Sequence, residues 1–431
     1  MPQRQLTFGY LSYALIGALL LCLPFMTNGS VSFVDNLFSA MSAVSTTGLS
    51  TVDVAVSYSF WGELLLLLLI QLGGIGYMTI STFVMYRVTR HFVGVRAKAF
   101  QTQFAMPECI TSGRMVTNII RYTLIFESVG ALLLYLFFRS DGVGQPLWSA
   151  VFHSVSAFCT AGFSIYSDNL MQFRTHVPVN LIIMTLSYAG AMGFIVISDL
   201  WRKLTRREYP ITFTTRVILW ITAGVTLWGT LQLFFFEPSF ARYGVGERLL
   251  VSLFQTMSAM TTVGYNTVDV SLLMPVSLFV LTIVMYIGAS PSGTGGGLKS
   301  TTVSAVFAFI RSRLGKRREV TLARRTIPDY RVHDALTIFI FYSFIFFLGT
   351  YLLTLFESER SEFLDLMFEA ASALGTVGLS SGVCATLSVW GKLILIVLMF
   401  IGRVGVLTIG NAMLIRLERE EGGRRKDDLV V

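Results

Sequence analysis

The sequence predicts an all-α polytopic membrane protein, and its composition, its apolar segments and an internal repeat each support this class. The 431 residues are 54% hydrophobic and only 13% charged, whereas soluble domains carry about 25% charged residues. A soluble enzyme of this length could not cover so much apolar surface with so few charges. The abundance of Leu, Ile, Val and Phe excludes a disordered chain.

Eight apolar segments are candidate membrane spans, because crossing ~30 Å of hydrocarbon takes about 20 mainly apolar residues. In chain order they are Phe8–Phe25, Trp61–Tyr86, Tyr122–Phe138, Pro178–Leu200, Ile211–Phe236, Leu272–Ser290, His333–Phe356 and Val389–Ile415. The first segment could also be a cleaved signal peptide, but its three internal counterparts argue against cleavage.

Basic residues gather in every second connector, which predicts the orientation of the chain. They follow the second, fourth, sixth and eighth spans, at Arg87, Arg90, Arg96, Lys98, Arg202, Lys203, Arg206, Arg207, Arg311, Arg313, Lys316, Arg317, Arg318, Arg324, Arg325, Arg416, Arg419, Arg424, Arg425 and Lys426. The positive-inside rule then places both termini in the cytoplasm. The formal charge of +8 therefore needs no nucleic acid partner.

The residues that usually carry catalysis or metal binding form no recognisable set. The four cysteines and the four histidines lack the spacing of a disulfide framework or a metal site. The spans contain no catalytic dyad and no nucleophile elbow. The sequence therefore does not predict an enzyme.

One motif recurs without gaps in each outward connector. It reads F-x-x-x-S-A-x-x-T-x-G and begins at Phe38, Phe152, Phe254 and Phe368. It divides the chain into four repeats, 1–92, 93–208, 209–325 and 326–431. Each repeat has a span, a short helix (about Asp35–Ser45 in the first copy), a T-x-G turn and a second span. The short helix cannot cross the bilayer, so we expect it to be re-entrant and to face protein or water.

The T-x-G turns predict a cation filter made of backbone carbonyl oxygens. Glycine tolerates a positive φ, so four such turns can direct rings of carbonyls at one axis, and each short helix aims its partially negative end there. Potassium channels use four T-V-G-Y-G loops in this way, and Thr262–Tyr265 matches the first four letters. A helix cap or a structural scaffold would not need four copies. The candidate filter residues are Thr46, Thr47, Gly48, Leu49, Thr160, Ala161, Gly162, Phe163, Thr262, Val263, Gly264, Tyr265, Thr376, Val377, Gly378 and Leu379.

On these motifs the chain resembles the Trk/Ktr/HKT superfamily of potassium transporters, from about Phe8 to Ile415. Subunits of that superfamily carry four linked M1–P–M2 repeats, so the resemblance implies eight transmembrane helices and four re-entrant pore helices around one pore. The first filter segment follows a single span, which matches the Ktr-type membrane subunit better than Trk. In the superfamily, Gly at all four filter positions accompanies potassium preference, and all four are Gly here.

The resemblance also implies partners and a location. It implies potassium uptake by a homodimer with one pore per subunit, in the plasma membrane of a prokaryote. It further implies regulation by a cytosolic RCK-type nucleotide-binding ring, since this chain has no nucleotide site of its own. The alternative is a Na⁺-conducting or Na⁺-coupled cation transporter of the same architecture, and the resemblance also allows Na⁺ as an activator.

A glycine-rich loop at 288–302 interrupts the sixth span, because its glycines and Pro291 cannot continue an ordinary helix. It is not a Walker A loop, since Leu298 separates Gly297 from Lys299. The resemblance implies that the loop is an intramembrane gate below the filter and that an arginine of the eighth span faces it. The alternatives are a passive kink, a snorkelling lysine and a structural partner for the arginine. The candidate gate residues are Gly293, Gly295, Gly296, Gly297, Lys299 and Arg403.

Three smaller features complete the interpretation. Acidic residues follow three of the filter segments and could form an outer mouth that concentrates cations, or else cap local turns: Asp53, Asp168 and Asp269. Glycine pairs in three second spans indicate close helix packing: Gly73/Gly76, Gly190/Gly193 and Gly402/Gly405. The basic stretch Arg311–Arg331 could bind anionic lipid.

Overall fold

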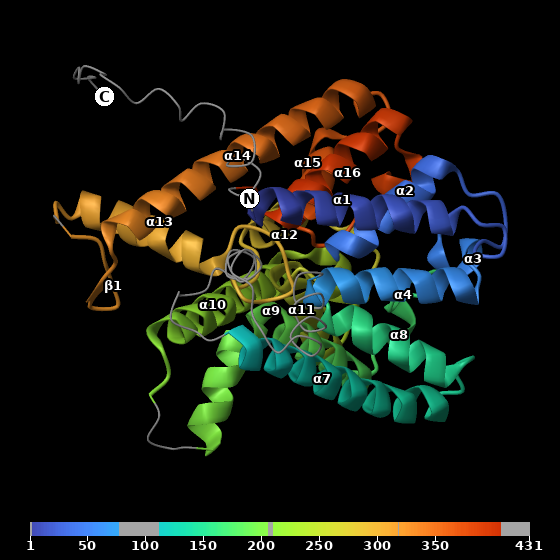
Figure 1. Ribbon diagram of the computed structural model, residues 1–431, viewed down its shortest axis with the longest axis horizontal. Coiled ribbons are helices and arrows are strands. Elements are labelled where there is room, and N and C mark those ends of the chain that lie inside the picture. Colours follow the sequence, from blue (N-terminus) through green and yellow to red (C-terminus); the bar gives the residue numbers. More distant parts are fainter. Residues whose placement is uncertain (1, 77–111, 206–209, 318, 407–431) are drawn as a thin grey trace.

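The computed structural model describes residues 2–76, 112–205, 210–317 and 319–406, and these residues are mainly helical (Figure 1). The helices are α1 (Pro2–Leu21), α2 (Phe33–Ser45), α3 (Val54–Ser57), α4 (Phe60–Ile75), α7 (Ser112–Ser140), α8 (Pro146–Phe158), α9 (Val177–Thr205), α10 (Phe213–Phe236), α11 (Val245–Thr261), α12 (Pro275–Tyr286), α13 (Ser300–Leu314), α14 (Asp329–Glu357), α15 (Phe363–Leu374) and α16 (Val389–Val404). Short 3₁₀ turns lie at Met171–Phe173, Pro238–Arg242, Val270–Leu272 and Val383–Thr386. A small antiparallel hairpin joins β1 (Thr321–Leu322) to β2 (Arg325–Thr326).

Each predicted span overlaps one of these helices. By length and hydropathy, four of them can cross a membrane: α7 from Thr117, α9, α10 and α14. The apolar helices α1, α4 and α12 are shorter, and α16 has 16 residues. The predicted ends of the second and eighth spans lie outside the described residues, as do the basic residues at 87–98, 206–207, 318 and 416–426.

A shorter helix follows the first long helix of each repeat: α2, α8, α11 and α15. The first of these begins at Phe33, two residues before the predicted start. Ser32 explains this boundary, because its hydroxyl accepts a hydrogen bond from the backbone N–H of Asp35 (3.2 Å) and so caps the helix. In every repeat the helix of the second predicted span packs on the short helix of the next repeat: α4 on α8, α9 on α11, α12 on α15 and α16 on α2. The packing order closes on itself.

Three sequence predictions need correction. The sixth span does not run from Leu272 to Ser290: α12 begins at Pro275, whose fixed φ suits the first helical position, and ends at Tyr286. The predicted loop at 288–302 ends earlier, because α13 starts at Ser300. The glycine pairs do more than pack helices: the second member of each pair has a positive φ and breaks its helix, at Gly76 (81°), Gly193 (73°) and Gly405 (90°).

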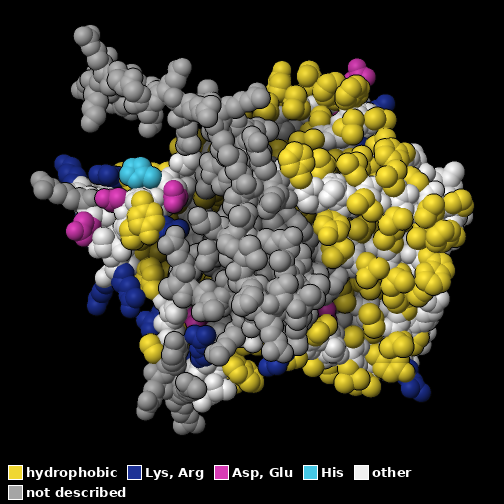
Figure 2. Space-filling view, viewed as in Figure 1, with side chains coloured by type: hydrophobic (Ala, Val, Ile, Leu, Met, Phe, Trp, Pro, Cys, Tyr) yellow, Lys and Arg dark blue, Asp and Glu magenta, His cyan; other side chains and the backbone are white. Residues whose placement is uncertain are grey.

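Hydrophobic side chains predominate on the described surface to the right of the grey residues, and most of the charged side chains in view lie at the opposite end (Figure 2). Large side chains such as Trp220 (79% exposed), Phe8 and Phe347 lie uncovered on the long helices. Lys and Arg side chains collect at the end where α13 and the β-hairpin project, opposite α3 (Figure 1). An apolar surface of this extent is suited to lipid rather than to water.

Candidate functional site

The T-x-G segments of repeats 1, 2 and 4 end their short helix with the same pair of hydrogen bonds, whereas in repeat 3 the N–H groups of Thr262 and Val263 both bond to the Ser258 carbonyl. In the first copy the Thr46 N–H bonds to the carbonyl of Ala43 (3.1 Å) and the Thr47 N–H bonds to that of Ser42 (2.8 Å). This pair of bonds is a Schellman motif, which requires a left-handed residue after the helix. Here that residue is a threonine in every repeat, with φ of 53°, 53°, 58° and 47° at Thr46, Thr160, Thr262 and Thr376.

A β-branched residue at positive φ is a strained conformation that costs roughly 1–2 kcal/mol. Such strain persists only where the surrounding structure imposes it, and it concentrates at functional sites. All four threonines are fully buried. Four copies of the same strain at the predicted filter therefore mark these segments as the candidate site.

The four glycines close the segments into a ring. Each has a positive φ: Gly48 (95°), Gly162 (63°), Gly264 (82°) and Gly378 (94°). A Cβ atom added to any of them would lie closer than 3.0 Å to the carbonyl oxygen of the next repeat, namely those of Ala161, Val263, Val377 and Thr47 in turn. The contacts run from repeat 1 to 2, 3, 4 and back to 1. Only glycine allows backbone to approach backbone this closely.

The motif serine binds the segment in two different ways in three repeats, and in repeat 3 the Ser258 hydroxyl has no hydrogen-bond partner among the described residues. Ser42 and Ser372 accept a hydrogen bond from the N–H of the filter glycine, Gly48 and Gly378 (3.0 Å each). Ser156 instead donates to the carbonyl of Phe163 (2.9 Å). The segments are therefore alike in their backbone and different in their side-chain support.

The residue after the motif phenylalanine lies buried behind each segment, and it differs in all four repeats: Ser39, His153, Gln255 and Glu369. Glu369 accepts hydrogen bonds from the Ser380 hydroxyl (2.6 Å), the Ser381 N–H (2.9 Å) and the Cys384 thiol (3.0 Å). The His153 ring contacts the Ser164 hydroxyl through Nε2 (2.9 Å). The Gln255 amide has no hydrogen-bond partner among the described residues. This position was not among the predicted site residues, although its polarity in all four aligned copies is a signal that the sequence carries.

The glycine-rich loop lies against the threonine end of the filter. The hydroxyls of Thr294 and Thr160 are 3.1 Å apart, and the Gly296 N–H donates to the Thr262 hydroxyl (3.3 Å). A Cβ on Gly296 would collide with the Thr376 hydroxyl. The predicted gate residues and the filter threonines of repeats 2, 3 and 4 are thus brought together.

The loop is anchored on the fourth span at its helix break. The N–H groups of Ser290 and Thr294 donate to the carbonyls of Ala191 (3.1 Å) and Gly190 (3.0 Å). At Gly193, a side chain would overlap the loop backbone at Ser292. The break in α9 therefore provides the surface on which the loop rests.

Arg403 connects the loop to the first repeat. Its guanidinium donates to the Thr46 hydroxyl (3.0 Å) and also to the carbonyls of Thr294 and Gly73. The Lys299 ammonium turns back to the loop carbonyl of Gly295 (2.7 Å). Both cations therefore bind loop carbonyls, and among the described acidic groups no ion pair is formed with either.

The predicted outer carboxylates are exposed at the ends of short turns. Asp53 accepts from the N–H of Ala55 (2.9 Å) and Asp269 from the N–H of Ser271 (3.0 Å), so both cap a turn. Asp168 is exposed after the second filter segment. The capping role that the sequence left open applies to the first two, and the outer-mouth role stays a prediction.

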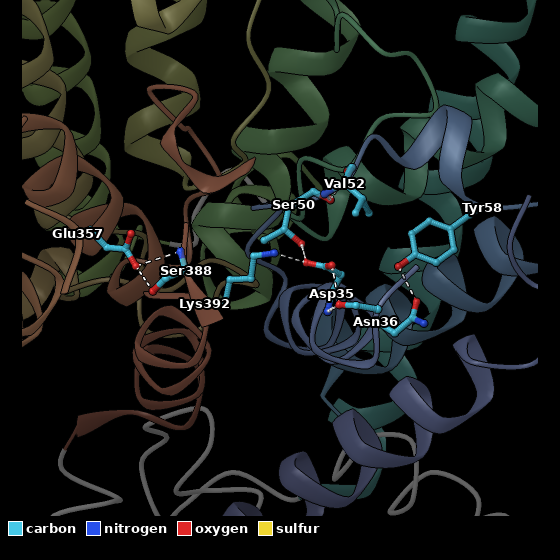
Figure 3. A network of polar contacts seen from close by, with 10 residues as sticks. Asp35, Asn36, Ser50, Val52, Tyr58, Glu357, Ser388 and Lys392 are labelled. Carbon is cyan, nitrogen blue, oxygen red and sulfur yellow. Dashed lines mark hydrogen bonds and ion pairs between the residues drawn. The ribbon is translucent and has the colours of Figure 1, made fainter. Parts of the chain in front are cut away.

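The outer junction of repeats 4 and 1 carries a polar network that the sequence did not predict (Figure 3). The Lys392 ammonium binds the Asp35 carboxylate (2.6 Å), which also accepts from the Thr51 hydroxyl (2.7 Å). Burial raises the pKa of Asp35, but the hydrogen bonds from Lys392, Ser32 and Thr51 outweigh it and the pKa is lowered. In the same view the Glu357 carboxylate binds the N–H and hydroxyl of Ser388.

Comparable outer contacts join two other repeat junctions. The Trp148 indole N–H donates to Glu63 (2.6 Å) between repeats 1 and 2, and Arg174 pairs with Glu247 (2.8 Å) between repeats 2 and 3. The pore-helix member of each contact is the third residue of its short helix. These residues do not align on the motif phenylalanine, which follows them by three, four and seven residues, so the sequence shows neither the shared position nor the residues that meet there.

The chain matches known transport proteins over most of its length. Residues 11–421 match the TrkH family, whose description is cation transport protein. The chain belongs to the TrkH family. Among its relatives is Ktr system potassium uptake protein B of Vibrio alginolyticus, 34% identical over 416 residues that cover 94% of this chain and 90% of the relative.

Other comparisons agree with this membership. Potassium/sodium uptake protein NtpJ of Enterococcus hirae is 31% identical over 438 residues, covering 97% of this chain and 94% of the relative. The crystal structure of the potassium transporter TrkH from Vibrio parahaemolyticus has the same fold, with a TM-score of 0.73 and 18% identity over 96% of this chain and 84% of that one. The predicted resemblance to Trk and Ktr transporters is thereby confirmed. In this TrkH-family chain, the glycine ring and the loop below it are the candidate ion pathway.

Proposed function

We propose that the chain is a potassium uptake transporter whose four M1–P–M2 repeats surround one ion pathway. The observation that carries this proposal is the closed ring in which each filter glycine meets the carbonyl of the next repeat. The names of the relatives, which include potassium uptake proteins, support potassium as the transported ion.

Selection would take place at the rings of backbone carbonyls along Thr46–Leu49 and the three equivalent segments. Carbonyl oxygens replace the hydration shell of a dehydrated cation. The number and position of these oxygens decide for which cation the binding energy offsets the cost of dehydration. Four short helices end at this point, and the partial negative charge at each C-terminus adds attraction for a cation. The exposed carboxylates Asp53, Asp168 and Asp269 would raise the local cation concentration outside.

The loop would gate the pathway from below. It contacts three of the filter threonines, and Arg403 contacts the fourth. Two cationic side chains at this level, Arg403 and Lys299, oppose the passage of a cation by charge repulsion. Flux then requires the loop to leave the threonine end, together with the two cations that bind its carbonyls.

The basic surface around α13 and the β-hairpin supports a proposed orientation of the chain. The positive-inside rule makes this the cytoplasmic side of a prokaryotic plasma membrane and places both termini there. We further propose that the protein is a homodimer and that a cytosolic RCK-type nucleotide-binding ring docks on this side. Anionic lipid headgroups would bind the same Lys and Arg side chains.

A sodium-conducting or sodium-coupled transporter is the second candidate. It is favoured by the name of the Enterococcus relative, which includes both ions. Glycine at all four ring positions favours potassium, as the family pattern implies. Na⁺ as an activator of potassium flux is compatible with the first candidate.

Cation flux into proteoliposomes tests the proposal. Purified protein, reconstituted with an outward K⁺ gradient and a fluorescent readout of membrane potential, should pass K⁺ and Rb⁺ in preference to Na⁺. Protein that passes Na⁺ as readily as K⁺ would refute the selectivity, and protein that passes neither, with and without a purified cytosolic ring, would refute transport.

A further inference from the structure

The outer half of the second filter segment is held by a tyrosine from the third. The phenol O–H of Tyr265 donates to the carbonyl oxygen of Phe163 at 2.9 Å. Tyr265 is fully buried and Phe163 is 2% exposed. At the aligned position the other repeats have Leu49, Phe163 and Leu379, so this hydroxyl occurs in one repeat alone.

The same carbonyl has a second donor. The hydroxyl of Ser156, also fully buried, donates to it at 2.9 Å from the short helix of repeat 2. A carbonyl oxygen has two lone pairs, and here both are engaged by protein hydroxyls. The Phe163 carbonyl therefore has no lone pair left for a cation, although the residue belongs to the predicted filter.

Neighbouring contacts join the same two repeats further out. The Leu170 N–H donates to the carbonyl of Asn266 (3.2 Å), and the Asn266 N–H donates to the side-chain carbonyl of Asn169 (3.4 Å). The His153 ring stacks on Tyr166 with centroids 4.7 Å apart and contacts Ser164, the residue after Phe163. Repeats 2 and 3 are thus bonded to each other directly along the filter.

We propose that the Tyr265 hydroxyl is a specificity-determining group, which with Ser156 fixes the Phe163 carbonyl outside the ion path and sets the spacing of the second and third filter segments. The inference rests on the proposed function, because specificity here means discrimination among cations. Below this carbonyl lie Gly162 and the Val263 carbonyl, which touch across the same junction. A shift of Phe163 therefore changes the distance between two carbonyls of the ring, and K⁺ and Na⁺ differ in how far their oxygen ligands must lie.

Tyr265→Phe is the first test, since it removes one oxygen atom and keeps the ring. Flux of K⁺, Rb⁺, Na⁺ and Li⁺ is measured in proteoliposomes with wild type and variant side by side. We expect the K⁺/Na⁺ flux ratio to fall about tenfold through increased Na⁺ flux. Ser156→Ala should change the ratio in the same direction. The double variant should change it by less than the product of the two single effects, because both hydroxyls bind one oxygen.

Tyr58→Phe is the matched control. Tyr58 is also buried, and its phenol donates to the side-chain carbonyl of Asn36 (3.0 Å) without touching a filter carbonyl. Both Tyr→Phe variants should lower the unfolding temperature, but only Tyr265→Phe should change the cation ratio. Equal losses of stability with unchanged ratios would overturn the proposal and leave a structural hydrogen bond.

The outcomes separate this inference from the proposed function. A wild type that prefers another alkali cation to K⁺ refutes potassium selectivity, and the variants are then compared on the ratio that the wild type shows. A selective wild type with an unchanged Tyr265→Phe refutes only the inference. A wild type that passes no alkali cation refutes both.

Discussion

The four filter segments are alike on their inner faces, but the side chains behind them differ from repeat to repeat. Each segment has the same left-handed threonine and the same glycine against the next carbonyl. Behind them stand a serine, a histidine, a glutamine and a glutamate. The inner contacts are made by backbone, which has one geometry, so the sequence there repeats. The rear contacts are made by side chains, and different side chains can fill the same place.

The difference shows where the four-fold symmetry ends. Glu369 has three separate groups bound to its carboxylate, and Gln255 at the same position has none among the described residues. A buried polar group without a partner costs about 1–3 kcal/mol. Repeats 3 and 4 are therefore supported unequally, although their T-V-G segments are identical.

Adding one methyl group to the ring should have the largest effect. In Gly162→Ala the new Cβ would overlap the carbonyl of Val263, and alanine at positive φ costs a further ~1–2 kcal/mol. The methyl group and the Val263 carbonyl both belong to the backbone-lined ring, so neither can move without displacing its filter segment. We therefore expect cation flux to fall at least about 100-fold. Gly224→Ala is the control, because nothing lies within 4 Å of its Cβ and alanine favours a helix by up to about 1 kcal/mol. Normal flux in Gly162→Ala would show that the ring is not the ion path.

Shortening the glycine-rich loop tests whether its contacts with three of the four filter threonines block the pathway. The loop contacts the threonines of repeats 2 to 4, whereas the first repeat is reached by Arg403. Deletion within Ser290–Gly297 should raise cation flux about tenfold, since it removes the backbone that lies against the threonines. Flux is compared with wild type in proteoliposomes at equal protein content. Unchanged flux would remove the gate assignment and leave the loop as a passive break in the sixth span.

Removing the carboxylate behind repeat 4 should destabilise the fold. Glu369→Leu leaves the Ser380 hydroxyl, the Ser381 N–H and the Cys384 thiol without an acceptor, which costs at least about 3 kcal/mol in total. Glu369→Gln keeps one acceptor oxygen and should cost less than half as much. Denaturation of the detergent-solubilised protein measures both. Equal stability of Glu369→Leu and wild type would show that the rear contacts do not support the segment.

How much the sequence predicts depends on the range of the contact. The Schellman turn at Ser42–Thr47 needs only neighbours in the chain, so the motif alone predicted a turn with glycine and the end of the short helix. The ring was predicted because the motif occurs four times, once in each outward connector. The loop boundary at Ser300 was missed by three residues, because helix starts are set by local caps that a glycine-rich pattern hides.

Contacts between distant residues could not be predicted. Lys392 and Asp35 are 357 positions apart, and Arg403 and Thr46 are equally far apart. Neither pair has a spacing signal, since they meet because the last repeat packs on the first. The buried Glu127, which accepts from the Gln71 amide (3.0 Å), was missed for the same reason. The glycine pairs were misread in part, since packing and helix breaking leave the same pattern in the sequence.

Acid should loosen the junction of repeats 4 and 1. The pKa of Asp35 is lower in the folded protein than its ordinary value of 3.8, which we take for the unfolded chain. The ionised carboxylate therefore stabilises the fold fully at pH values above the unfolded pKa. This stabilisation is lost as the pH falls through the lower pKa of the folded state. The pair is partly exposed and should contribute at most about 1 kcal/mol. Unfolding temperatures of wild type and Lys392→Met should therefore differ slightly at pH 7 and converge below pH 4. A difference that grows on acidification would contradict the ion pair.

The smallest expected effect comes from the repeat that lacks rear contacts. Gln255→Leu removes two buried polar atoms that bind nothing among the described residues and replaces them with a side chain of similar length. The free energy of unfolding should stay equal or rise by about 1 kcal/mol, because an orphaned amide is replaced by apolar contact. Cation selectivity should be unchanged, since the Gln255 amide binds no filter carbonyl among the described residues and the Tyr265–Phe163 hydrogen bond is kept. A loss of more than about 1 kcal/mol would mean that the amide binds a water molecule behind the filter. In that case a bridging water molecule would connect Gln255 to the filter segment of repeat 3, where Glu369 binds the segment of repeat 4 directly. The four residues behind the segments would then all support the filter, despite their different side chains.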